Sequence, residues 1–194
     1  MTHSTTLLFL LFIALHIVCL CASGVRTPEW LNAMGGTGTD QSLDSVVDSN
    51  GNVIITGSFQ GTASFNGTQI LSNGGTDIFL ASYQSNGSLN WVKSFGGTNN
   101  DAGTAVVVDS SGNIFLTGYV HGLGSFDGFS FVAIAGRDLF VARVNSQGVT
   151  QWVKGAGSIG NDEAYGIVLD NAGDLYITGG FSGAITWLVV NTIV

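Results

Sequence analysis

Charge and proline are both scarce in this chain. Of its 194 residues, 5 are Lys or Arg, 13 are Asp or Glu, and one is proline. Nucleic-acid phosphates require a basic surface, so a formal net charge of −8 argues against a nucleic-acid partner. The same deficit of basic residues disfavours binding to anionic lipid headgroups.

The N-terminus has the layout of a secretory leader. Leu7 to Cys21 is almost continuously apolar, and the small residues Ala22-Ser23-Gly24 follow. The apolar run is about 15 residues, shorter than the roughly 20 that span a bilayer. We therefore expect a signal peptide over residues 1–24 and a secreted or cell-surface protein with no membrane span after cleavage. Because residues 1–6 contain no Lys or Arg, an uncleaved anchor and a lipoprotein site at Cys21 stay open as alternatives.

Cleavage would also remove both cysteines of the chain, Cys19 and Cys21, together with two of its three histidines. The mature chain would keep His121 alone. We expect no disulfide in it, so its core and backbone hydrogen bonds must hold it together.

The rest of the chain repeats every 61 residues without insertion or deletion. Nine residues are identical in all three copies at spacings of 61 and 122, which in the first copy are Trp30, Gly35, Asp40, Val46, Asp48, Gly51, Thr56, Gly57 and Gly61. A fixed period of this length is typical of a repeat architecture. The units run over 30–90, 91–151 and 152–194, about 2.7 copies in all.

Each unit reads as a succession of short strands. In the first unit, residues 44–48 and 53–59 flank the turn Ser49-Asn50-Gly51-Asn52, which predicts a hairpin. A looser hairpin is expected around Asn66-Gly67, and a third joins 77–83 to 89–93. Since the region has no sustained helical period, the sequence predicts an all-β, propeller-like array of antiparallel blades.

Several motifs resemble the SBBP-type β-propeller repeat. They are Asp77-Ile78-Phe79-Leu80-Ala81, Ser85-Asn86-Gly87, Trp91-Val92-Lys93, Gly96-Gly97-Thr98 and Asp109-Ser110-Ser111-Gly112-Asn113. The resemblance covers about residues 30–183 and implies an exported or cell-surface propeller without an established catalytic motif. Copy three departs from the pattern after residue 183, where an apolar tail from Thr186 replaces the expected hairpin. We interpret the array as an incomplete propeller: a fragment of a larger ring, a subunit of an assembly, or an open array.

The repeated residues are predicted to be structural. They are Trp30, Trp91 and Trp152, expected between neighbouring sheets, and Asp48, Asp109 and Asp170 with Gly51, Gly112 and Gly173, expected in turns. Ca²⁺ is the functional alternative for these Asp residues, but the glycine stands fourth rather than sixth and no bidentate Glu follows. For Asp40, Asp101 and Asp162 we expect side-chain bonds to backbone N–H groups. The sequence thus predicts no metal and no cofactor.

No catalytic residue is predicted. His121 falls in a loop position that varies between copies, and Asp162-Glu163 is the one adjacent acid pair, whose side chains point to opposite faces of a strand. Asn66 and Asn86 begin N-glycosylation sequons at expected turns, to be used if the host is a eukaryote.

These observations favour a secreted, non-enzymatic module that binds or scaffolds an unidentified protein or carbohydrate and can self-associate through open blade edges. Two alternatives stay open. One is a carbohydrate-active or other hydrolase whose site forms only in the complete ring, and the other is a truncated, non-functional product.

Leader cleavage can be checked directly. N-terminal sequencing of the exported protein is expected to begin near Val25, because the small residues before it fit a signal-peptidase site. An intact leader in the membrane fraction would contradict the prediction.

Overall fold

In the computed structural model, the described residues are 16–18 and 30–188. Most of the expected leader, with both cysteines and the cleavage site, therefore lies outside the described residues, as does the tail from Val189 on. The described part of the chain has no helix long and apolar enough to cross a membrane.

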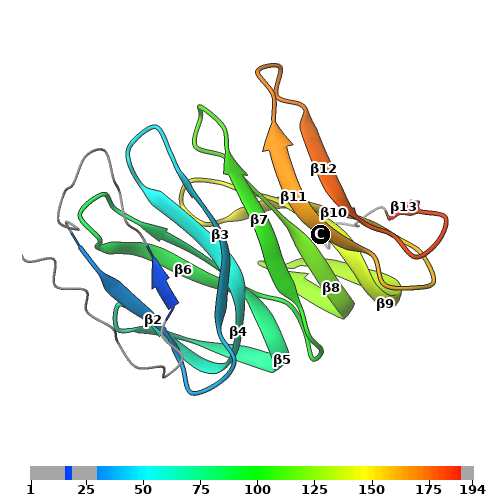
Figure 1. Cartoon of the computed structure of the whole chain (residues 1–194), viewed down its shortest axis with the longest axis horizontal. Helices are drawn as coiled ribbons and strands as arrows, with labels where there is room; N and C mark the ends of the chain where they lie inside the picture. Colours follow the sequence, from blue (N-terminus) through cyan, green and yellow to red (C-terminus); the bar gives the residue numbers. More distant parts are fainter. Residues whose placement is uncertain (1–15, 19–29, 189–194) are drawn as a thin grey trace, which may run out of the picture.

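The expected all-β fold and its antiparallel blades are confirmed, and the sheets do not close into a ring (Figure 1). The first blade consists of β3 (Gln41–Val47), β4 (Val53–Phe65), β5 (Thr68–Tyr83) and β6 (Leu89–Phe95). The second consists of β7 (Ala102–Val108), β8 (Ile114–Phe126), β9 (Phe129–Val144) and β10 (Thr150–Gly157). A half-blade of β11 (Glu163–Leu169) and β12 (Leu175–Gly180) follows. The first strands of the three units, β3, β7 and β11, lie side by side.

Blade boundaries differ from the boundaries of the sequence units. Each unit begins with a tryptophan, but the segment of Trp91 pairs with β5 and that of Trp152 with β9. The tryptophan strand is thus the last strand of the preceding blade. A single sequence could not show this, because a period fixes spacing and leaves its phase open.

The hairpin expected around Asn66-Gly67 is not separate. β4 and β5 are long strands that pair from Val53↔Tyr83 through to Phe65↔Thr68, with an irregularity between Gln60 and Thr62. Gly61, at φ 72°, supplies the bend. One long bent hairpin therefore replaces the two short ones.

The remaining strands show how the units are joined. The end of β2 (Asn32–Gly36) pairs with the tip of β4, with Gly35 opposite Ser64. Gly96 lies opposite Ser125 at the next junction, and Gly157 lies opposite Thr186 of β13 (Thr186–Leu188) at the third. Copy three therefore keeps the backbone pairing of the junction although its sequence departs there. β1 (His16–Val18) pairs antiparallel with the other edge of β2.

The core lies between the blades. Ile54, Ile78 and Leu80 of the first blade share one buried cluster with residues of the second blade that include Val106, Ile114 and Leu116. Both faces of the central strands are covered, which explains their continuous apolar runs.

The repeated tryptophans connect neighbouring blades. Trp30 Nε1 donates a 2.8 Å hydrogen bond to the carbonyl oxygen of Ser85, and Trp91 Nε1 donates one of 3.0 Å to that of Ser146. Each acceptor lies in a turn whose glycine must be bare, because a Cβ on Gly148 would stand 2.8 Å from the Trp91 ring. Trp152 makes no corresponding bond within the described residues.

The Trp91→Phe variant tests this connection. We expect it to lower the free energy of unfolding by about 1 to 2 kcal/mol, since it loses one hydrogen bond and part of an inter-blade contact. Trp152→Phe is the matched control and is expected to cost less than half as much. Urea unfolding followed by circular dichroism measures both, and equal losses would contradict the interpretation.

Candidate functional site

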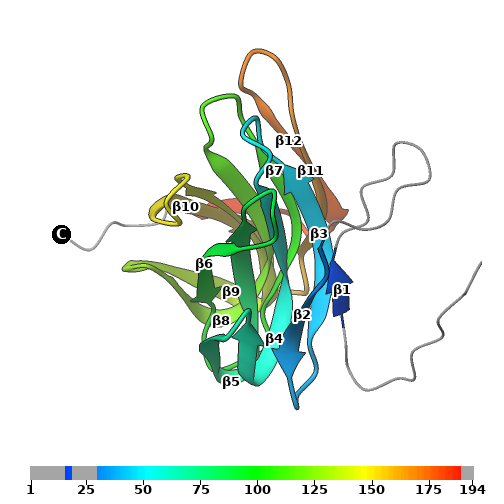
Figure 2. The ribbon, with the colours of Figure 1, turned by 90° about the vertical axis from the view of Figure 1, so that its left-hand side faces the viewer.

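The turns after β3, β7 and β11 gather at one end of the molecule, as both ribbon views show (Figures 1 and 2). In the first, Asp48 Oδ1 accepts the backbone N–H groups of Asn50 and Asn52, both at 2.8 Å. Burial acts to raise the pKa of Asp48, but the bonds from Asn52, Asn50 and Gly51 outweigh it and leave that pKa lowered. Asp109 and Asp170 repeat the arrangement, with Gly112 and Gly173 at positive φ like Gly51. These carboxylates are occupied by their own turns.

A second set of repeated carboxylates holds the blade junctions. Asp40 Oδ2 accepts the N–H of Gly36 at 2.7 Å, and its Oδ1 accepts that of Gln60 at 3.2 Å. Asp101 binds the N–H groups of Gly97 and His121 in the same way, and Asp162 binds those of Ser158 and Ser182. Each carboxylate thus ties the link between blades to a strand 20 residues away.

Asp101 faces a second buried carboxylate, that of Asp77. Asp77 is 2% exposed and Asp101 is 0% exposed. A Cβ on Gly96 would lie 2.6 Å from Asp101 Oδ2 and 2.9 Å from Asp77 Oδ1, so the two oxygens border the same small space. Asp77 Oδ2 accepts the N–H of Asn73, but its Oδ1 has no hydrogen-bond partner.

Burial raises the pKa of Asp77 to about 6. Burial also raises the pKa of Asp101 to about 7, and the charge of Asp77 adds to this while hydrogen bonds from His121 and Gly97 oppose it. Two buried carboxylates this close do not both ionise cheaply. A proton held between Asp77 Oδ1 and Asp101 would give the unpartnered oxygen a hydrogen bond.

The next junction repeats the pair as Asp138 and Asp162, both 0% exposed. Asp138 Oδ2 accepts the N–H of Ile134, and its Oδ1 again has no partner. Burial raises the pKa of Asp138, and the charge of Asp162 adds to it. The pairing is therefore a property of the junction and not an accident of one loop.

The sequence analysis missed Asp77 and Asp138 because it kept residues common to all three copies, and position 16 is a histidine. A signal was present: an aspartate recurs after 61 residues at the head of an apolar strand, where a charge is expensive to bury.

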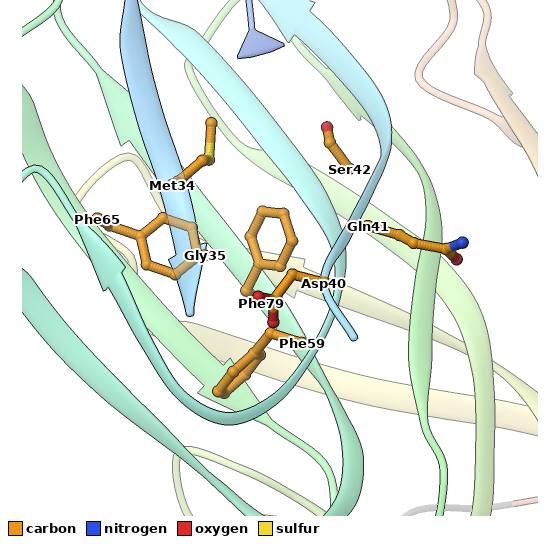
Figure 3. Close-up of a pocket in the computed structure, with 8 residues that line it drawn as sticks. All are labelled: Met34, Gly35, Asp40, Gln41, Ser42, Phe59, Phe65 and Phe79. Atoms are coloured by element: carbon orange, nitrogen blue, oxygen red, sulfur yellow. The ribbon is translucent and has the colours of Figure 1, made fainter. Parts of the chain in front are cut away.

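The first junction has a small cavity where the others hold the second carboxylate (Figure 3). It is lined by Met34, Gly35, Asp40, Gln41, Ser42, Phe59, Phe65 and Phe79. A Cβ on Gly35 would meet Asp40 alone, 2.9 Å from its Oδ2. The volume of about 10 Å³ suits a single water-sized group.

The other predicted site residues lie apart from these junctions or serve them through the backbone. His121 is exposed, and its main-chain N–H is the group that binds Asp101. Glu163 forms a 2.5 Å ion pair with Arg137, while Asp162 is taken up by its junction. Asn66 and Asn86 are exposed in hairpin turns. Among the described residues, no group of three or more His, Cys, Asp or Glu side chains could hold a metal ion.

An open groove runs between three turns and the side chain of Trp91. It measures about 670 Å³ and is lined by Asn50, Asn52, Gln84, Ser85, Asn90, Trp91, Ser146 and Gln147. All are uncharged, so the groove offers amide and hydroxyl groups rather than acid–base chemistry.

The carboxylate pair predicts a stability that falls as pH rises. A folded-state pKa above the unfolded value of 3.8 contributes stability that is complete below about pH 4 and is lost as pH rises through about 6 to 7. The loss is on the order of 3 kcal/mol for a shift of about two units. Urea midpoints between pH 4.5 and 7.5 measure it.

Asp77→Asn replaces one acid by a neutral amide that can donate to Asp101 at any pH. We expect the variant to show a flatter profile than the wild type and greater stability at pH 7.5. Asp40→Asn is the control, because that junction has no facing acid among the described residues, and it should leave the slope of the profile unchanged. A wild-type slope in Asp77→Asn would contradict the pairing.

Comparison with known proteins agrees with this geometry over part of the chain. No curated protein matches the sequence. Residues 90–123 match the family model SBBP, described as a beta-propeller repeat. That stretch runs from the last strand of the first blade, through the junction at Asp101, into β8. The resemblance stated from the sequence motifs is thereby confirmed: the chain carries a beta-propeller repeat of the SBBP family.

Proposed function

We propose that this chain is a secreted or cell-surface, non-enzymatic module that binds and scaffolds by packing its open blade faces onto further blades. The secreted location rests on the leader-like sequence of residues 1–24. The non-enzymatic role is supported by the use of the repeated acids, since the Asp48 and Asp40 sets are bound by backbone N–H groups. Glycans at Asn66 and Asn86 would project from exposed turns, away from the blade faces.

One observation carries the proposal: a face of the half-blade lacks the cover that the same face has in the other blades. Tyr176 is 56% exposed, whereas its counterparts Phe115 and Ile54 are 8% and 2% exposed. Val168 is 60% exposed, although its counterparts Val46 and Val107 pack against the clusters between blades. Tyr176 and Val168 form what we call the tail face.

The opposite end of the array is open as well. Val47 is 54% exposed, while its counterparts Val108 and Leu169 pack against the preceding blade. Both ends thus present surfaces that the repeat itself covers elsewhere, and exposed apolar faces of this kind mark protein contacts. Contact between unlike ends of two copies joins them head to tail.

Light scattering after size exclusion tests the proposal over a range of concentrations. The chain is expected to associate as concentration rises, and Tyr176→Lys should reduce association by placing a charge on the tail face. Tyr165→Lys is the matched control, because Tyr165 is 62% exposed but its counterpart Leu43 is exposed too, at 45%. A wild-type chain that stays monomeric throughout would overturn the proposal.

A further inference from the structure

The cavity at the first junction is the counterpart of a space that β5 fills at the second junction and β9 fills at the third. In those two junctions the aspartate of Asp77 or Asp138 stands beside the carboxylate of Asp101 or Asp162. At the first junction Asp40 has the same two N–H partners and no second carboxylate among the described residues. Its cavity accommodates one water-sized group. That size fits the end of one carboxylate side chain.

The register of the neighbouring strands shows how such a carboxylate would arrive. Ile78 of β5 pairs with Phe95, and Leu139 of β9 pairs with Ala156. Phe95 and Ala156 both correspond to Met34 in β2. A strand that paired with β2 in this register would place an apolar residue opposite Met34 and the preceding aspartate beside Gly35 and Asp40.

The strand that does pair with β2 leaves the cavity unfilled. β1 covers three residues, with His16 opposite Met34, and contains no Asp or Glu. It is also part of the leader that we expect to be removed. A longer strand in the register of β5 would gain the backbone bonds of β2 and fill the cavity.

We propose that β2 and the cavity beside Asp40 bind an extended segment of another repeat chain that reads Asp followed by alternately buried apolar residues, as in Asp77-Ile78-Phe79-Leu80-Ala81. A folded second copy does not supply it, because both edges of β5 and of β9 are already paired. The partner is therefore a repeat chain whose corresponding strand has a free edge. This inference rests on the proposed blade-to-blade function and names the partner of its first blade.

Binding should take up a proton. The incoming carboxylate would face Asp40 in a cavity whose other lining residues, on β2, β3, β4 and β5, are all uncharged. Two carboxylates there avoid the cost of a second buried charge by holding one proton between them. The Asp77 and Asp101 pair shows the same arrangement within the chain.

The test uses a fluorescent peptide with the sequence of residues 74–83, flanked by lysines for solubility, and the full chain as receptor. Fluorescence anisotropy should show saturable binding that is at least tenfold tighter at pH 5.5 than at pH 8, since one unit of pKa shift corresponds to a factor of ten. A scrambled peptide of the same composition should not bind. The chain from Val25 onward, which lacks β1, should bind the peptide more tightly than the full chain.

Two substitutions identify the carboxylates. A peptide with the Asp77→Asn change, and separately the Asp40→Asn receptor with the original peptide, should bind with little dependence on pH. Asp174→Asn alters an exposed acid of the half-blade and should leave binding and its pH dependence unchanged. No binding of the original peptide, binding equal to that of the scrambled peptide, or equal affinity at both pH values would overturn the proposal.

The outcome is separable from that of the proposed function. Tyr176→Lys lies on the half-blade and should weaken self-association without changing peptide affinity. If the chain self-associates but does not bind the peptide, this inference is wrong and the blade-packing proposal stands. If the chain stays monomeric but binds the peptide with the expected pH dependence, the tail face is not the contact and the β2 site remains.

Discussion

The fold depends on one carboxylate that binds two backbone N–H groups at each blade junction. A link leaving one sheet for the next has lost the strand pairing that would satisfy its N–H groups, and such groups are costly to bury. Asp40, Asp101 and Asp162 provide the missing acceptors, one oxygen for the link and one for the strand of the next blade. Because the same bonds recur in each copy, adjacent blades meet in the same way, and the array can extend by repetition.

This junction also explains residues that otherwise look unrelated. The glycine before the link must be bare, since a Cβ on Gly96 would crowd both Asp101 and Asp77. The aspartate at the head of the third strand then faces a charge that the junction requires, so a proton becomes part of the packing. Burial of acids usually makes a protein less stable at low pH when they are ionised in the native state. Here the buried pair works in the opposite direction, because one of its members is favoured as a neutral acid.

The sequence predicted much of this and missed a definable part. Exact recurrence of Asp48 and Gly51 predicted the turns, and alternation between apolar runs and glycine turns predicted the blades. The phase of the blades was missed, because whether Trp91 pairs backward or forward depends on contacts between units that a period does not encode. Asp77 was missed for a different reason. Its meaning comes from the carboxylate it faces, and that neighbour is 24 residues away across a junction whose geometry only the fold provides.

The location of the free binding capacity follows from the same physics. Within the array each unit satisfies its neighbour: the indole N–H of Trp91 finds Ser146, the apolar face with Ile54 meets Val106, and Asp101 meets Asp77. Interior chemistry is therefore spent on joining units, and what stays available lies where a neighbour is missing. At one end this is an apolar face around Tyr176, which selects by burial of area. At the other it is the β2 edge with its cavity at Asp40, which selects by register and by one acid. The two ends thus differ in specificity, because an apolar face tolerates many shapes while a strand edge with one buried carboxylate position accepts only a segment that places an acid there.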